Sequence, residues 1–413
     1  MRLVILTGGG GAGRTTVAAA TAVHAARCGI KTLLLAASEG HARGPAAVLE
    51  GADGPDGEVL PGLHVRRVPG PGDLVPGPDG SRRSDIGADT GAGPAGLSAD
   101  LAAALGVDLP APELLDLLPG ATELASSHAL ARAVTQGRWD LVVVDGPPAE
   151  GALRMLTLPA LLDAALAKAL PDERRVTRLL SGPAGAGADA LVEAAQRAHA
   201  ALAELRAVLA ATSVSVRLVA APTREGIAQA RRATTALHLH GYVVDALVVN
   251  ALVPDPGGGA GQDGWLAAVA VEQQTQLAAA RTAFTTLPVR TLLHAGPPPR
   301  GTDALALLGE QLYGPAGPGA ADALVAVPAR DREAVRVDRD GAGFVLRIAL
   351  PTARSGEVSL ARRGDDLVVT VPTARRILAL PAGLRRCTVT GARLRDGELA
   401  VGFEPDPTRW RTV

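Results

Sequence analysis

The chain has 413 residues, of which 47% are hydrophobic and 20% charged, and its formal net charge at pH 7 is −1. A balance this close to neutral gives no electrostatic reason to expect a nucleic-acid partner or an anionic membrane partner. The length exceeds what one hydrophobic core usually organises, so we expect more than one domain.

The two cysteines, Cys28 and Cys387, lie far apart and form no C-x-x-C pair. They therefore give no support to a disulfide framework or a cysteine zinc site. No run reaches the roughly 20 uninterrupted apolar residues that a membrane span requires. The apolar run at the N-terminus, Leu3 to Ile5, is shorter than that of a signal peptide. These features predict a cytoplasmic protein without a membrane span.

Short β-rich runs alternate with Ala- and Leu-rich helical runs over most of the chain. This alternation predicts an α/β fold in which helices cover both faces of a parallel sheet. The predicted strands are 2–6, 31–36, 63–68, 141–145, 216–221 and 244–250, and the predicted helices include 15–28, 97–105, 188–211 and 224–240. Two segments rich in Gly and Pro, 69–96 and 254–264, are predicted loops.

The pattern changes after residue 313, where the chain reads "GPAGPGAADA". Beyond this stretch the helical period is lost, and short strands follow one another with turn residues between them. Such spacing is typical of a small all-β sandwich. We therefore predict an α/β domain over 1–315, a linker over 316–328 and a β-sandwich over 329–407.

The first predicted strand runs into "LTGGGGAGRTT", residues 6–16, and a predicted helix follows. The stretch fits the phosphate-loop pattern G-x-x-x-x-G-K-[ST] at every defined position except the lysine, which is an arginine. Backbone N–H groups of such a loop and the helix N-terminus bind phosphate oxygens. The predicted nucleotide-binding residues are Gly8, Gly10, Gly11, Gly13, Arg14, Thr15 and Thr16.

The segment "RWDLVVVDGPP" places Asp145 at the end of an apolar strand. Taken alone, an aspartate in that position is more often a helix cap or a turn residue. Together with the glycine-rich loop, it predicts a Mg²⁺ site made by the Thr15 hydroxyl and the Asp145 carboxylate.

Five segments in order resemble the arsenite-pump and tail-anchored-protein-targeting ATPases. They are the loop at 6–16, "LLPGATELA" (117–125), "DGPPAEGALRMLTLP" (145–159), "VDALVVNALVP" (244–254) and "PPRGTDALALLGEQLYG" (298–314). The resemblance implies a phosphate-loop ATPase domain with ATP and Mg²⁺ as cofactors. It also implies that Asn250 contacts adenine and that the protein is a homodimer.

The segment 364–405 resembles the α-crystallin, small-heat-shock-type β-sandwich, with its L-P-x-x-L and G-A-x-x-x-D-G-x-L-x-V landmarks. Two interpretations of this tail stay open. It is either a free-standing chaperone domain or a packing domain that covers an exposed edge of the ATPase fold.

Several positions depart from the family pattern. The family lysine that acts across the dimer falls on Gly9, and the common phosphate-loop lysine falls on Arg14, whose planar fork does not replace an ammonium in a tight loop. The two switch I aspartates fall on Ser38 and Pro45. Because a cation at the transferring phosphoryl group is worth about 10³ to 10⁵ in rate, hydrolysis should be weak or lost.

Three hypotheses follow for function. The first is a homodimeric, nucleotide-responsive chaperone or targeting factor with weak or lost hydrolysis. The second is an active ATPase that uses Arg14 and Glu150 as substitutes for the missing groups. The third is a chaperone or scaffold that needs no nucleotide.

The resemblance also bears on partners. The family's cysteines for zinc and for arsenite are missing, so neither site is expected. The helical region 154–180 is either a groove for a hydrophobic client or a dimer-packing surface.

Overall fold

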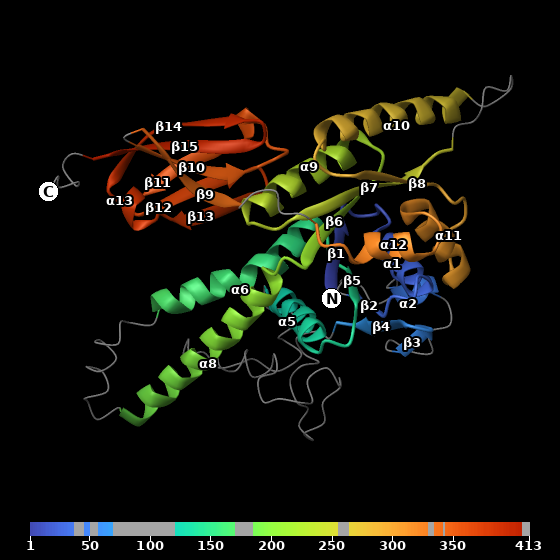
Figure 1. Cartoon of the computed structure of the whole chain (residues 1–413), viewed down its shortest axis with the longest axis horizontal. Coiled ribbons are helices and arrows are strands. Elements are labelled where there is room, and N and C mark those ends of the chain that lie inside the picture. Colours follow the sequence, from blue (N-terminus) through green and yellow to red (C-terminus); the bar gives the residue numbers. More distant parts are fainter. Residues whose placement is uncertain are drawn as a thin grey trace.

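The computed structural model describes residues 1–36, 45–49, 57–68, 120–169, 185–254, 264–328, 334–341 and 343–406. An α/β part built on one 8-stranded sheet is followed by an all-β part of two smaller sheets (Figure 1). This arrangement confirms the predicted fold class. The predicted helix 97–105, the predicted loop 69–96 and Ser38 lie outside the described residues.

The large sheet has the strand order β3-β4-β2-β5-β1-β6-β7-β8. All neighbouring strands pair in parallel except β3 and β4, which are antiparallel. The strands are β1 (Arg2–Gly8), β2 (Thr32–Ala36), β3 (Gly57–Leu60), β4 (Leu63–Arg67), β5 (Leu141–Asp145), β6 (Val214–Ala220), β7 (Val244–Leu252) and β8 (Val289–Leu293). The central strands are buried along their whole length, as continuous apolar runs covered on both faces require.

Helices cover both faces of this sheet. One face packs against α1 (Arg14–Arg27), α2 (Pro45–Leu49), α11 (Gly301–Tyr313) and α12 (Pro318–Val325). The other face packs against α5 (Ala121–Thr135), α6 (Ala149–Ala169), α8 (Gly185–Leu209), α9 (Arg224–Leu239) and α10 (Gly264–Ala283). None of the helices in the described ranges combines the length and hydropathy needed to cross a bilayer.

Three elements differ from what the sequence indicated. Strands β3 and β8, at the two edges of the large sheet, were not predicted. Helix α12 lies inside the predicted linker 316–328 and buries Ala320 and Leu324 in the core under α1. Edge strands and short helices carry weak periodic patterns, because few of their side chains are buried on more than one side.

The all-β part is a sandwich of two antiparallel sheets, with orders β14-β15-β10-β9 and β11-β12-β13. Its strands are β9 (Val335–Asp340), β10 (Gly343–Ala349), β11 (Ser359–Arg363), β12 (Asp366–Val371), β13 (Ala374–Ala379), β14 (Cys387–Arg395) and β15 (Glu398–Pro405), with a 3₁₀ turn at Ser355–Glu357 and α13 at Ala382–Arg385. Alternate residues of facing strands, among them Leu346, Val369 and Phe403, fill the space between the sheets.

The sandwich packs against helix α9 of the α/β part (Figure 1). Ala236 and Leu239 of α9 belong to the same buried cluster as the sandwich core. The Arg376 side chain on β13 donates a hydrogen bond of 2.6 Å to the Leu239 carbonyl at the end of α9. The sandwich therefore covers a helix on one face of the large sheet.

Candidate functional site

The glycine-rich loop lies at the carboxyl edge of the large sheet, between β1 and α1. Strand β1 pairs with β5, and their register sets Leu6 opposite Asp145. The loop therefore leaves β1 beside the point where β5 ends. Crevices outside the carboxyl ends of parallel strands are the usual ligand sites of open α/β sheets.

Two loop positions require glycine. Gly8 has φ 155°, and a Cβ there would lie 1.9 Å from the Val219 carbonyl oxygen on β6. Gly13 has φ 85° and caps the N-terminus of α1, and a Cβ there would lie 2.2 Å from Asn250 Nδ2. By contrast, Gly10 and Gly11 are exposed and have open space around them. The ends of the loop are thus tightly held, and its middle faces solvent where an anion can approach.

Arg14 is the first residue of α1. Its guanidinium donates a hydrogen bond to the Gly146 carbonyl oxygen, in the segment that follows β5. Burial lowers the pKa of Arg14 and the nearby Asp145 carboxylate partly offsets this, so the side chain keeps its charge. Arg14 therefore ties the loop to the end of β5.

The Thr15 hydroxyl donates a hydrogen bond of 2.8 Å to Asp145 Oδ2. Asp145 is 0% exposed, and its Oδ1 has no hydrogen-bond partner among the residues that the structure describes. Burial raises the pKa of Asp145, against the opposing effects of Thr15 and Arg14. A buried carboxylate oxygen left without a partner is costly unless a ligand completes it. The donor set, one hydroxyl and one carboxylate at a phosphate loop, fits Mg²⁺.

Asn250 lies on β7, and its side-chain amide donates a hydrogen bond of 2.9 Å to the Ala12 carbonyl oxygen. The structure thus brings Asn250 to the same loop that the sequence motif marks. Thr16 follows Thr15 in the first turn of α1. Pro45, which falls on the switch I aspartate of the family, is buried at the start of α2.

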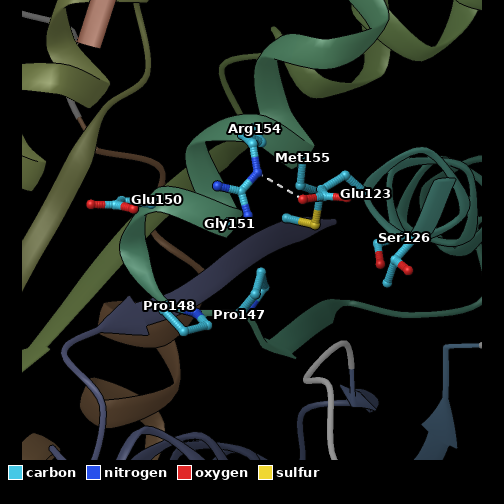
Figure 2. Close-up of a pocket in the computed structure, with 9 residues that line it drawn as sticks. Glu123, Ser126, Pro147, Pro148, Glu150, Gly151, Arg154 and Met155 are labelled. Atoms are coloured by element: carbon cyan, nitrogen blue, oxygen red, sulfur yellow. Dashed lines mark hydrogen bonds and ion pairs between the residues drawn. The ribbon is translucent and has the colours of Figure 1, made fainter. Parts of the chain in front are cut away.

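A cavity of about 230 Å³ lies beside the segment after β5 (Figure 2). Arg154 on α6 crosses it and pairs with Glu123 on α5 at 2.8 Å, so two segments of the resemblance meet here. Glu150, in the first turn of α6, is exposed and points away from this pair in Figure 2. Glu150 therefore stands at the entrance of the cavity.

Sequence reasoning missed two residues that contact the loop or its neighbours. Thr7 on β1 donates a hydrogen bond of 2.6 Å to the Pro147 carbonyl oxygen. Gln229 on α9 lies against Gly9, as described below. No sequence signal marks Gln229, because it lies more than 200 residues from the loop along the chain.

Comparison with known proteins adds to this geometry. The sequence model of the family described as "Anion-transporting ATPase" matches residues 1–42 and 102–314. The chain belongs to this ArsA ATPase family. A second model, described as an HSP20-like domain found in ArsA, matches residues 341–403 and confirms the resemblance of the tail.

The similarity to known proteins covers nearly the whole length of the chain. An uncharacterised protein of Streptomyces coelicolor is 40% identical over 99% of both chains. A Mycobacterium tuberculosis protein is 33% identical, covering 100% of this chain and 98% of its own. A Prosthecochloris vibrioformis protein, named provisionally as an arsenical pump-driving ATPase, is 26% identical over 98% of this chain and 96% of its own.

The described residues contain no group of three or more His, Cys, Asp or Glu side chains placed to hold a metal ion. Cys387 is buried and Cys28 is half-buried, and both are free thiols. The Thr15–Asp145 pair is the candidate metal-binding arrangement at the loop.

Proposed function

We propose that this ArsA-family chain binds ATP with Mg²⁺ at the loop Gly8 to Thr16 and hydrolyses it weakly or not at all. The observation that carries the proposal is the buried Asp145 carboxylate, which shares one oxygen with Thr15 and leaves the other without a partner. A buried acid of this kind is characteristic of a ligand site rather than of a packed core.

Each group has a definite task in this proposal. Thr15 and Asp145 hold Mg²⁺, which neutralises phosphate charge when it is bound. Backbone N–H groups of the loop and the N-terminus of α1 bind the phosphate oxygens. Asn250, on the neighbouring strand β7, holds the loop through Ala12 and lies where the resemblance expects an adenine contact.

The groups that would speed hydrolysis are diverted or missing. The Arg14 guanidinium bonds to the Gly146 carbonyl, so its position is set by the segment after β5. Gly9 carries no side chain, and the Pro45 side chain has no acceptor that could orient water. Because the missing cation alone is worth about 10³ to 10⁵ in rate, binding without efficient turnover is the consistent outcome.

We extend the proposal to a homodimeric, nucleotide-responsive chaperone or targeting factor in the cytoplasm. Family membership and an exposed apolar side chain support it: Leu161 on α6 is 61% exposed. A hydrophobic client or a second copy of the chain is the partner in this extension. Light scattering of the purified chain, with and without Mg²⁺ and ATP, measures the oligomeric state directly.

Paired measurements test the central proposal. Calorimetry with Mg²⁺ and ATP should give a binding heat that the Asp145→Ala variant loses. Phosphate release by the natural chain should lie close to that of Asp145→Ala. Release far above this control would instead support an active ATPase that uses Arg14 and Glu150. A folded chain that gives no heat with ATP or ADP would support a nucleotide-independent scaffold.

A further inference from the structure

Helix α9 brings a side chain to the phosphate loop from outside the loop motif. A Cβ built on Gly9 would lie 2.7 Å from Gln229 Oε1. The Gln229 carboxamide therefore lies where a side chain at position 9 would begin, which is the position of the family lysine. Because Gly9 has no side chain, the Gln229 side chain can occupy the space next to it.

The N-terminus of α9 is held close to the same part of the sheet. The Thr223 hydroxyl caps the helix by accepting a hydrogen bond of 3.1 Å from the Gly226 amide. A Cβ at Gly226 would lie 2.5 Å from the Ala221 carbonyl oxygen, just after β6. Because Val219 on β6 also contacts Gly8, the loop and the N-terminus of α9 both pack against β6 and the residue that follows it.

The opposite face of α9 is fixed by the β-sandwich. Arg231 follows Gln229 by two residues, about 200° around a helix with 3.6 residues per turn. Its side chain is 8% exposed and binds both Glu357 oxygens, at 2.5 and 2.6 Å. Arg231 also donates a hydrogen bond of 3.1 Å to the Thr352 carbonyl. One turn later, the Thr235 and Thr352 hydroxyls lie 2.9 Å apart.

We propose that Gln229 is an anion-binding residue of the phosphate loop and that the docked sandwich positions it. This inference rests on the proposed nucleotide binding. A carboxamide carries two N–H donors, and rotation about its last bond presents them to a phosphate oxygen at the loop. Gln229 thus supplies a neutral donor where the family uses a lysine, and Arg231 with Glu357 acts as a positioning pair.

The test is calorimetric titration of the full chain with Mg²⁺ and ATP. Gln229→Ala should weaken the affinity about tenfold, because it removes one hydrogen bond to a charged group. Gln229→Glu should weaken it further through like-charge repulsion. Arg232→Ala is the matched control, because Arg232 lies on the same helix and bonds to the exposed Glu225. Its affinity should equal that of the natural chain.

The positioning role of Arg231 and Glu357 is tested by a measurement that general destabilisation of the fold would not change. Glu357→Gln should weaken ATP binding several-fold in the natural chain and leave it unchanged in the Gln229→Ala background, because the two act through one contact. Equal weakening in both backgrounds would overturn the role of the sandwich.

Failures of the two proposals are distinguishable. A natural chain that binds no ATP overturns the proposed function and this inference together. A natural chain that binds ATP with the same affinity as Gln229→Ala overturns the inference alone.

Discussion

Two buried aspartates of the large sheet have opposite surroundings. Asp145 ends β5 at the carboxyl edge and accepts one hydrogen bond from Thr15, while its Oδ1 has no partner in the described part of the chain. Asp245 lies near the start of β7, at the amino edge. Its carboxylate accepts two hydrogen bonds from Arg217, of 2.8 and 3.0 Å, one of 2.6 Å from Arg2 and one of 3.0 Å from Ser215.

The difference separates a carboxylate that stabilises the fold from one that, in the proposed function, binds a ligand. Asp245 compensates two buried guanidiniums. Burial alone would lower the pKa of Arg217, but Asp245 and Tyr313 outweigh it and raise that pKa above its ordinary value. Asp145 instead lies beside the glycine-rich loop, in which Gly10 and Gly11 have open space around them. The same residue type thus serves stability at one edge and, in the proposed function, ligand binding at the other.

The largest expected effect concerns Asp245, whose carboxylate accepts hydrogen bonds from Arg2, Arg217 and Ser215. Asp245→Ala should lower the free energy of unfolding by about 3–5 kcal/mol, because it leaves Arg2 and Arg217 buried without their counter-charge. Urea denaturation measures this loss. The control is Asp303→Ala, since the Asp303 side chain is 94% exposed in its pair with Arg27. Exposed pairs contribute about 0.2–1 kcal/mol, so equal losses in the two variants would erase the distinction.

A second prediction restores the missing groups at the carboxyl edge. Gly9→Lys, Arg14→Lys and Pro45→Asp combined should raise phosphate release about tenfold or more, because a cation returns at position 9, an ammonium replaces the guanidinium at position 14, and a water-orienting carboxylate returns at position 45. The new side chain at position 9 meets the flexible end of Gln229, which can move aside. The control adds Asp145→Ala to the same combination. No gain in rate would mean that loop geometry has diverged as well as charge.

The third prediction exchanges the two aspartates for their amides. Asp145→Asn should raise the free energy of unfolding by about 1 kcal/mol and weaken Mg²⁺-dependent ATP binding. The reason is that burial raises the pKa of Asp145, so its charged form costs stability at neutral pH. Asp245→Asn should instead lower the stability. Thermal melts at pH 7 compare the two variants, and a shift of equal sign would contradict the assignment of roles.

The last prediction concerns the pH dependence of stability. Burial and the nearby Arg376 lower the pKa of His240, which faces the sandwich, to about 4. Stability should be full above the unfolded value of about 6.5 and fall as pH decreases toward 4, because the unfolded chain takes the proton first. Protonation of Asp145 opposes this fall, since its folded pKa is raised.

Melting temperatures between pH 7 and pH 4 check both signs. The decrease should be shallower in His240→Gln than in the natural chain and steeper in Asp145→Asn. Identical slopes in all three proteins would show that neither group controls acid stability.

Several parts of the site were predictable from the sequence for a physical reason. The loop at Gly8 and the strand that ends at Asp145 are local signals, since glycine spacing and apolar runs are read within a few residues. The Thr15–Asp145 contact followed because parallel strands bring their carboxyl ends to one edge. The position of Glu150, exposed at the start of α6, did not follow, because one residue of helical phase decides which way it points.

The α/β part, the β-sandwich after it, the phosphate loop and the lack of a lysine at positions 9 and 14 can all be read from the amino-acid sequence. These features depend on periodicity and on residues that are neighbours in the chain. Tertiary packing, in contrast, brings Arg2, Arg217 and Asp245 into one cluster, and it sets Gln229 of α9 against Gly9 while Arg231 pairs with Glu357. Apart from Arg217 and Asp245, which are 28 positions apart, these contacts join residues more than 100 positions apart, and packing rather than local pattern selects them.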